Sequence, residues 1–339
     1  MLKVVMISLY DYADSGKRIM EALSRHTDHE CSYVCIFDKS VTYPPVRKKQ
    51  PLTAGDVLAI QEADVIIYKG DELLRMDTGG DIVIVEKSGR NVRMKTKKHR
   101  LGIRMPQAKR IQLAGGGGFR RLTKGNNTNT FQWFGFSEYR TDMFLSISPE
   151  MAYPEINCKH LGFAIDSEGI ENTWKMSTPL KVYAYDSPKA AIDRKGARAH
   201  LFPAIERLRN EGYEVDLIVA KNLTYQENLK LKSTASICFE NIAEYGCYGN
   251  SGVEALAMGI PVMCWISDES INQAGFPYGE CVFNVKNSED VYCCLRDILI
   301  GIIDLGKVSK ESKEHCDKYF SYRAVANRLN QYLIQCIGN

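Results

Sequence analysis

A short run at residues 248–262, YGNSGVEALAMGIPV, combines residue types that bind phosphates and hydroxyl groups. Gly249 and Gly252 allow the backbone to turn tightly and to approach a ligand, and Ser251 lies between them. The helix expected to follow begins with amide N–H groups that have no partner inside the helix, and such an end favours a phosphate. Glu254, in its first turn, offers two acceptor oxygens to a pair of vicinal ribose hydroxyls. The run therefore predicts a nucleotide site in this part of the chain.

The order of residues in this run resembles the donor-binding signature of GT-B glycosyltransferases, in particular the retaining enzymes of glycosyltransferase family 4. The family pattern of Gly, Glu-Ala, a small residue, Gly and Pro-Val is matched by Gly252, Glu254-Ala255, Ala257, Gly259 and Pro261-Val262. The resemblance implies an α/β protein of the GT-B fold, with two facing Rossmann-like domains and a cleft between them. It also implies transfer of a sugar from a nucleotide-sugar donor, which the C-terminal domain holds and which is a co-substrate; no cofactor is expected.

The same resemblance assigns a second part of the donor site to a loop upstream. The family carries a basic residue and a Lys-Gly pair after the first strand of the second domain, where they neutralise the donor diphosphate. Lys195, followed by Gly196, matches the pair, and Lys189 stands for the basic residue. A cation there stabilises the negative charge that the leaving group gains as the sugar bond breaks. A solvated surface lysine is the ordinary alternative for Lys195.

One position departs from the family pattern. Family 4 enzymes usually carry another glutamate, which touches the donor sugar, eight residues before the one that Glu254 matches, and this chain has Gly246 there. Glu240 and Glu244 lie nearby but out of register, and either could take that role. The identity of the sugar, and whether its anomeric configuration is retained, stay open at the level of the sequence.

Two α/β units are needed to position these residues. Short apolar runs alternate with helical stretches in both halves, which is typical of parallel sheets covered on both faces. Strands are expected at 3–9, 31–37, 64–68, 180–185, 215–219, 236–240 and 261–266, and helices at 15–24, 198–211 and 252–258. The length of 339 residues also exceeds one usual core. We expect an N-terminal acceptor domain at 1–165, a donor domain at 166–320, a join near 163–179 and a packing helix at 321–339.

Loops of the first half that follow expected strands are candidates for the acceptor site, because ligands bind at the carboxyl ends of strands in open α/β sheets. Three loops fit, at 11–16, 69–72 and 115–121. In the second, Asp71 is a candidate general base for an acceptor hydroxyl, and a turn-capping aspartate is the alternative. His99 is a competing base, although its basic surroundings favour a surface role.

The third of these loops holds a run of four glycines at 115–118. Gly117 and Gly118 would permit close approach of the backbone to an acceptor, and Arg120 could then reach a phosphate. A flexible connector explains the same run of glycines.

The basic residues are concentrated in one segment. From residue 87 to residue 137 there are thirteen Lys or Arg and no Asp or Glu, although the net charge of the chain is only +3. Part of this segment alternates apolar and charged residues about Ser88-Gly89-Arg90-Asn91, which predicts a hairpin within an insertion at about 80–110. Lys95, Lys97 and Lys98 are therefore assigned to acceptor binding.

This charge predicts a polyanionic acceptor. Nucleic acid is the leading candidate, by analogy with phage GT-B enzymes that glucosylate hydroxymethylated DNA bases; aromatic residues at 131–136 could stack on bases, and the target base would have to flip out. An anionic lipid or a phosphorylated envelope saccharide would explain the same charge, as would a solvated hairpin without a partner. A non-catalytic nucleic-acid-binding protein of this fold, an epimerase and a phosphorylase are the competing classes.

Composition argues against a membrane-spanning, a disulfide-linked and a zinc-stabilised protein. No apolar run approaches the roughly 20 residues that a membrane-spanning helix needs, so a cytoplasmic protein is expected. The eleven cysteines are odd in number and lack paired CxxC spacings, which favours reduced thiols and no structural metal. The oligomeric state stays open.

Overall fold

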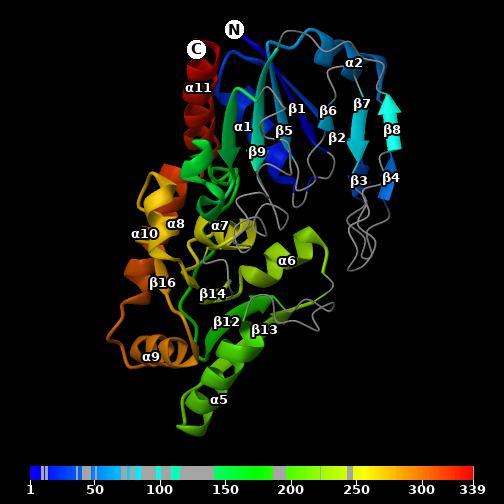
Figure 1. Ribbon diagram of the computed structural model, residues 1–339. Coiled ribbons are helices and arrows are strands. Elements are labelled where there is room, and N and C mark those ends of the chain that lie inside the picture. Colours follow the sequence, from blue (N-terminus) through cyan, green and yellow to red (C-terminus); the bar gives the residue numbers. More distant parts are fainter. Residues whose placement is uncertain are drawn as a thin grey trace.

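The computed structural model describes residues 1–8, 11, 14–35, 37–39, 47–49, 52–69, 75–76, 81–84, 97–100, 108–114, 141–185, 196–221, 223–242 and 247–338. For the short strands at 37–39, 47–49, 75–76, 81–84 and 97–100 it describes the backbone alone. Two parallel sheets, one in each half of the chain, form the framework (Figure 1).

The first half forms a six-stranded sheet in the order β11-β10-β9-β5-β1-β2, and every neighbouring pair is parallel. Its strands are β1 (Lys3–Ser8), β2 (Glu30–Cys35), β5 (Val65–Lys69), β9 (Lys109–Ala114), β10 (Met143–Ser146) and β11 (Lys159–His160). Its helical segments are α1 (Ser15–His26), α2 (Ala54–Gln61) and the short turns Pro149–Met151 and Pro154–Ile156. The buried strands are near-continuous apolar runs, such as Val4 to Ile7, because both faces of a parallel sheet are covered.

The second half forms a five-stranded parallel sheet in the order β13-β12-β14-β15-β16. Its strands are β12 (Leu180–Tyr185), β13 (Val215–Ala220), β14 (Ile237–Phe239), β15 (Val262–Cys264) and β16 (Val282–Asn284). Its helices are a π-helical turn (Ala197–Leu201), α5 (Phe202–Asn210), α6 (Tyr225–Lys232), α7 (Asn250–Ala257), α8 (Asp268–Ala274), α9 (Ser288–Leu299), α10 (Leu305–Tyr319) and α11 (Tyr322–Gly338). The expected α/β class with two Rossmann-like units is thereby confirmed.

Short antiparallel strands accompany the first sheet. β3 (Phe37–Lys39) pairs with β4 (Arg47–Lys49), and β7 (Asp81–Ile84) pairs with both β6 (Arg75–Met76) and β8 (Lys97–Arg100). In the β7–β8 pair Asp81 lies opposite Arg100 and Ile84 opposite Lys97. The turn of the expected hairpin, at 88–91, lies outside the described residues.

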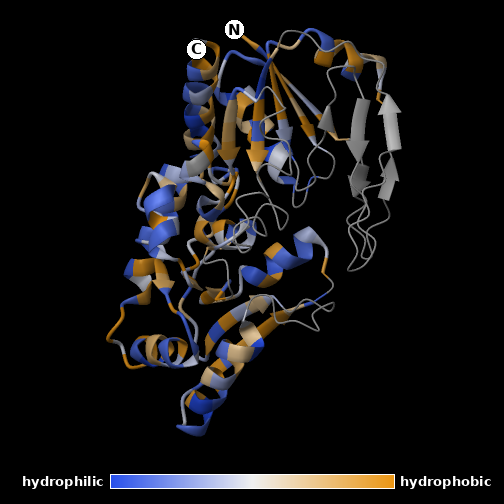
Figure 2. Ribbon diagram, in the orientation of Figure 1, coloured by the Kyte–Doolittle hydropathy of each residue, from blue (hydrophilic) through white to orange (hydrophobic). Residues whose placement is uncertain are grey.

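One continuous apolar core crosses from the first half to the second. It includes strand residues of the first sheet, α7 of the second half, and the buried face of α11, on which Val325, Leu329 and Leu333 are fully buried. α11 packs along α1, so the last helix of the chain covers the first sheet (Figure 1). Figure 2 shows the corresponding hydrophobic strands inside and hydrophilic helix faces outside.

Each sheet changes its winding direction at one place. In the first sheet β2 lies on one side of β1 and β5 on the other, and in the second sheet β13 and β14 flank β12 in the same way. Loops diverge at such a point, and open α/β sheets bind ligands there. The loops after β1 and β5, and after β12 and β14, are therefore the places to look for a site.

No helix in the described ranges is both long and apolar enough to cross a membrane. None of the eleven cysteines is in a disulfide, and the structure describes all of them.

Candidate functional site

The loop after β14 leads into α7, and the start of this helix is open. Gly249 is the residue before the helix, and a Cβ built on it would meet no atom of the described residues within 4 Å. The amides of Gly252 and Val253 donate to the carbonyl oxygen of Gly249, and no side chain in the described part of the chain caps the helix start. Such an end presents backbone N–H groups to a ligand anion.

Gly252 does not begin α7, as the sequence predicted, but lies inside its first turn, because the helix begins two residues earlier than expected. A Cβ on Gly252 would come within 2.8 Å of the Tyr248 Cβ and 3.3 Å of the Glu240 Cγ. The glycine is therefore needed because α7 packs directly onto the residues at the end of β14. Glu254 consequently lies in the second turn of the helix and not in the first.

The helix ends as the sequence predicted. Gly259 adopts a left-handed φ of +73°, and the amide of Ile260 returns to the carbonyl oxygen of Ala255 at 2.8 Å. This sharp stop sends the chain directly into β15 and fixes the length of α7.

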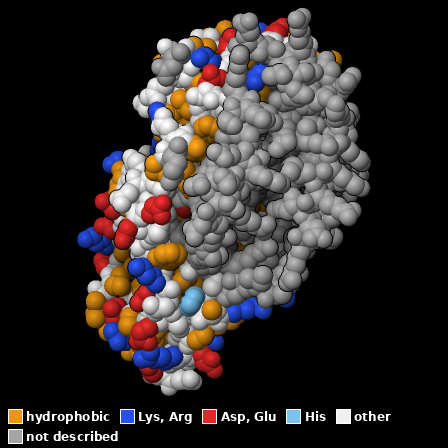
Figure 3. Space-filling view, viewed as in Figure 1, with side chains coloured by type: hydrophobic (Ala, Val, Ile, Leu, Met, Phe, Trp, Pro, Cys, Tyr) orange, Lys and Arg blue, Asp and Glu red, His pale blue; other side chains and the backbone are white. Residues whose placement is uncertain are grey.

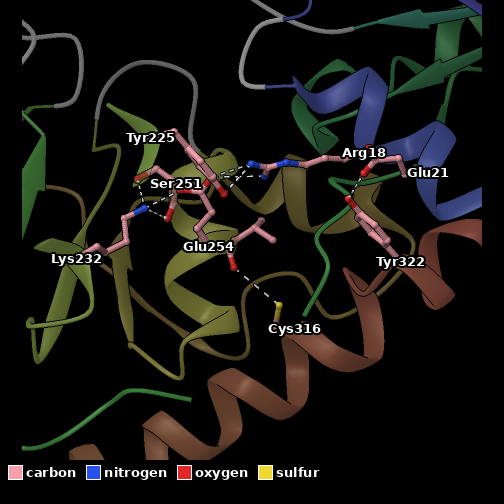
Figure 4. Close-up of polar contacts among 9 residues, drawn as sticks. Arg18, Glu21, Tyr225, Lys232, Ser251, Glu254, Cys316 and Tyr322 are labelled. Carbon is pink, nitrogen blue, oxygen red and sulfur yellow. Dashed lines mark hydrogen bonds and ion pairs between the residues drawn. The ribbon is translucent and has the colours of Figure 1, made fainter. Parts of the chain in front are cut away.

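Glu254 lies where the two halves of the chain meet. Its Oε2 accepts from the Lys232 Nζ at 2.9 Å, and its Oε1 is 3.4 Å from both terminal guanidinium nitrogens of Arg18. Arg18 belongs to α1 of the first half, whereas Lys232 ends α6 of the second half (Figure 4). The Glu254 side chain is only 5% exposed, so its charge is compensated by these two cations rather than by water.

Arg18 is held from a second side by Tyr225, at the start of α6. One guanidinium nitrogen donates to the Tyr225 hydroxyl at 2.8 Å. Burial alone would lower the pKa of Arg18, but Tyr225 and Glu254 outweigh it and raise that pKa above its ordinary value. Burial, together with the Glu254 charge, raises the pKa of Tyr225 to about 12. At neutral pH Arg18 is therefore charged and the Tyr225 phenol is neutral.

A second buried ion pair lies at the winding change of the first sheet. The Lys69 ammonium, at the end of β5, contacts the Asp11 carboxylate after β1 at 2.6 Å. The Tyr33 hydroxyl and the amides of Gly16 and Lys17 also donate to Asp11, which thereby caps the start of α1. Burial would raise the pKa of Asp11, but Lys69 and the two amides hold it below its ordinary value.

This pair closes the start of α1. Two loops that the sequence proposed for the acceptor, those at 11–16 and 69–72, therefore meet through Asp11 and Lys69. The anion at this helix end is the protein's own carboxylate, whereas no side chain of the described residues caps the corresponding end of α7.

The remaining predicted residues are placed only in part. Seven of them lie outside the described residues: Asp71, Lys95, Gly117, Gly118, Arg120, Lys189 and Lys195. Lys97 and Lys98 lie in β8, where only the backbone is described. Among the positions considered for the missing glutamate, Glu240 directly follows β14 and is 1% exposed, and Glu244 lies outside the described residues.

Sequence reasoning missed Arg18, Lys232 and Tyr225. Lys232 is the last residue of a helix with the sequence YQENLKLK, where a lysine normally interacts with solvent and with the helix dipole. Arg18 lies next to the apolar residue Ile19 on α1, but nothing in its spacing points to a partner 236 residues away. Only tertiary packing brings these side chains to Glu254: Lys232 and Tyr225 come from α6 of the same half, and Arg18 comes from α1 of the other half.

Comparison with known proteins supports the fold. No protein-family model matches the sequence, and no curated protein matches it either. Among solved structures, the chain is similar to Anabaena HepE in complex with UDP-glucose, with 10% identity over 99% of this chain and 100% of that one and a TM-score of 0.58.

Two further structures resemble it as closely. One is an alpha-glucosyltransferase in complex with UDP and a 13-mer DNA containing a central A:G mismatch, with 11% identity over 98% of both chains and a TM-score of 0.58. The other is sucrose-phosphate synthase from Thermosynechococcus elongatus, with 12% identity over 99% of both chains and a TM-score of 0.57. The chain therefore has the GT-B fold; at these identities the likeness extends to the fold alone.

We expect the Arg18→Met variant to lose about 1–3 kcal/mol of unfolding free energy, because its removal leaves Glu254 with one buried cation instead of two. Arg25, about two helical turns further along α1, is the matched control, since its pair with Asp166 is exposed. Arg25→Met should cost clearly less than Arg18→Met, because solvent screens an exposed pair. Urea denaturation measures both, and equal losses would contradict the role given to Arg18.

We expect the Asp11→Asn variant to lose about 3–5 kcal/mol of unfolding free energy at pH 7, because Lys69 is left buried without its counter-ion. The pKa of Asp11 is lowered in the folded protein, so its contribution is complete above the ordinary carboxyl pKa of about 4 and is lost as the pH falls through the lower folded value. Urea unfolding from pH 7 to pH 3 should show the difference between the two proteins shrinking only at the acid end.

The exposed Asp14 provides the control for this pair. Asp14→Asn should change the unfolding free energy by less than about 0.5 kcal/mol at any pH in this range. A difference between wild type and Asp11→Asn that shrank already above pH 5 would refute the assignment.

Proposed function

We propose that this protein transfers a sugar from a nucleotide-sugar donor to an acceptor hydroxyl, with the nucleotide held at the start of α7. The observation that carries this proposal is the position of Glu254: in a GT-B fold, it lies beside a helix start that no described side chain caps, and it contacts Arg18 of the opposite half. Of the donor-site residues predicted from the sequence, Gly249, Ser251, Gly252 and Glu254 lie in the first two turns of α7 or directly before it.

The ribose and the diphosphate have separate places in this proposal. Vicinal ribose hydroxyls would donate to Glu254, whose Oε1 lies 3.4 Å from the Arg18 guanidinium nitrogens. The diphosphate would accept from the amides at the start of α7. Lys195 and Lys189, from the loop after β12, would neutralise it; Gly196, at the end of that loop, adopts the left-handed φ of +75°, which fits the Lys-Gly pair.

The catalytic step needs a stabilised leaving group and a deprotonated acceptor. Cations and helix amides around the nucleoside diphosphate would stabilise the charge that develops on it. Asp71 follows the end of β5 by two residues, and we propose it as the base that takes the acceptor proton.

For the acceptor, nucleic acid is the leading proposal. The basic segment at 87–137 supports it, as does the likeness of the fold to an alpha-glucosyltransferase in complex with UDP and DNA. On the described part of the face in Figure 3, basic and acidic side chains are intermixed, so the described surface on that side offers a polyanion no single-sign patch. The acceptor proposal therefore rests on the basic segment, with Lys95, Lys97 and Lys98 assigned to acceptor binding.

We expect the protein to bind a nucleoside diphosphate and to transfer sugar from the matching nucleotide-sugar. Glu254→Gln should weaken nucleotide binding about 10- to 100-fold, since hydrogen bonds to a charged group are worth about 1.5–3 kcal/mol. Calorimetry with a panel of nucleoside diphosphates measures the binding, and mass spectrometry of reactions with several donors and acceptors identifies the product.

The control for Glu254 is Glu206→Gln, an exposed glutamate on α5, which should bind like wild type. No binding of any nucleotide by the wild type would exclude a donor site and leave a non-catalytic binding protein. Binding without transfer to nucleic acid, but with transfer to a lipid or saccharide, would replace the acceptor proposal and keep the donor site.

Reversing charge at Lys95, Lys97 and Lys98 together should reduce transfer to the acceptor at least tenfold and leave donor hydrolysis unchanged, because the acceptor and donor sites are separate in this proposal. Acceptor binding by the wild type should weaken steeply between 50 and 200 mM salt as counterions are released. Product formation measures the loss of transfer, and binding titrations from 50 to 200 mM salt measure the salt dependence.

A matched triple charge reversal at the exposed Lys286, Lys307 and Lys310 of the second half should leave transfer unchanged. If both triple variants lose transfer equally, net charge rather than the basic segment is responsible. Equal loss of transfer and donor hydrolysis in the first variant would also refute its assignment.

A further inference from the structure

Lys232 is a fully buried ammonium beside the proposed nucleotide site. Its side chain has an exposed fraction of 0%, although it ends a helix whose other lysine, Lys230, is exposed. Burying a charge is costly unless it is paired and hydrogen-bonded, so the partners of this ammonium define its role.

All three protons of the ammonium have acceptors on one helix. Nζ donates to the carbonyl oxygen of Ser251 at 2.9 Å, to the Ser251 hydroxyl at 3.0 Å and to the Glu254 Oε2 at 2.9 Å. Ser251 lies in the first turn of α7 and Glu254 in the second, so a single cation joins the start of the helix to its carboxylate (Figure 4).

This arrangement fixes which oxygen of Glu254 faces the opposite half. With Oε2 held by Lys232, Oε1 is the atom directed toward Arg18. Arg18 cannot fix the carboxylate equally well, because both of its contacts to Oε1 are 3.4 Å long, beyond the 2.7–2.9 Å of a strong charge-assisted bond. Lys232 also belongs to the same half as Glu254, so its hold does not depend on the position of the first half.

We propose that Lys232 is a positioning residue for ribose recognition: its ammonium fixes the Glu254 carboxylate and the first turn of α7, so that Oε1 is presented to a ribose hydroxyl. The inference rests on the proposed function, in which Glu254 binds the ribose. It adds a residue that acts through Glu254 and touches no substrate itself.

A role in stability alone would not require a lysine. Replacing a buried ion pair with well-packed apolar residues is often neutral or stabilising, so the pair is weak evidence for a stability role. The two possible roles of Lys232 differ in one measurable effect. A positioning residue sets how strongly the protein prefers a ligand with ribose hydroxyls, whereas a residue that only stabilises the fold does not.

The test compares nucleoside diphosphates with their 2′,3′-dideoxy analogues by calorimetry, in wild type and in Lys232→Met. We expect wild type to prefer the ribonucleotide by roughly tenfold or more, the contribution of a hydrogen bond to a charged acceptor. In Lys232→Met the ratio of the two dissociation constants should fall to about 1–2, with the affinity for the dideoxy analogue changed less than about twofold.

Three further variants isolate the effect. Lys230→Met removes an exposed lysine from the same helix and should keep the wild-type ratio. Adding Lys232→Met to Glu254→Gln should leave the ratio of that variant unchanged, because Lys232 acts through the carboxylate. Should Lys232→Met fail to fold, Lys232→Gln retains one donor group in the same place and is expected to show an intermediate ratio.

An unchanged ratio in Lys232→Met would overturn the inference, as would an equal loss of affinity for both ligands, which indicates general damage to the site. Either result leaves the proposed function intact if wild type binds nucleotides. A wild type that binds no nucleotide overturns both, and one that binds both ligands equally removes the ribose role of Glu254 and the inference with it.

Discussion

The organisation of the site depends on a single buried carboxylate held between two cations. Glu254 is bonded to Lys232 within its own half and contacts Arg18 of the other half. A carboxylate removed from water requires such partners, and replacing either cation with a neutral residue would leave charge uncompensated. The two cations come from different halves. Glu254 therefore keeps both counter-charges only while the first half lies close enough for Arg18 to reach it.

The two halves meet in two physically different ways. On one side they share an apolar core, in which α11 packs on α1 and the buried His160, whose pKa burial lowers to about 4, bonds to the Ala274 carbonyl oxygen of α8. Near Glu254 the described residues of the two halves make polar contacts, which include a 3.4 Å ion pair between the Glu254 Oε1 and the Arg18 guanidinium. Apolar packing is non-directional and tight, whereas long ion-pair contacts are readily exchanged for hydroxyl or phosphate contacts.

The starts of α1 and α7 differ in how their backbone N–H groups are bonded. Both helices follow a strand at a change of winding, where backbone N–H groups gather. At the start of α1, the backbone amides donate to the Asp11 carboxylate, and Lys69 is the counter-ion of Asp11. At α7, Gly249 leaves open space, and no side chain of the described residues caps the helix. Among the described residues, the start of α7 is therefore left open, whereas the start of α1 is occupied by a carboxylate of the protein.

The sequence alone determined the two parallel sheets and the helices at 15–24 and 252–258 to within about two residues, because apolar periodicity and glycine spacing are local signals. It misplaced the start of α7 and assigned Gly252 to a turn, since the contact of that glycine with Tyr248 and Glu240 arises only when the helix packs on β14. Only the tertiary structure selected Arg18 and Lys232 from among 44 lysines and arginines. Charge pairing across long sequence separations depends on which surfaces fold together, and nothing in the spacing of a lysine shows that it will be buried.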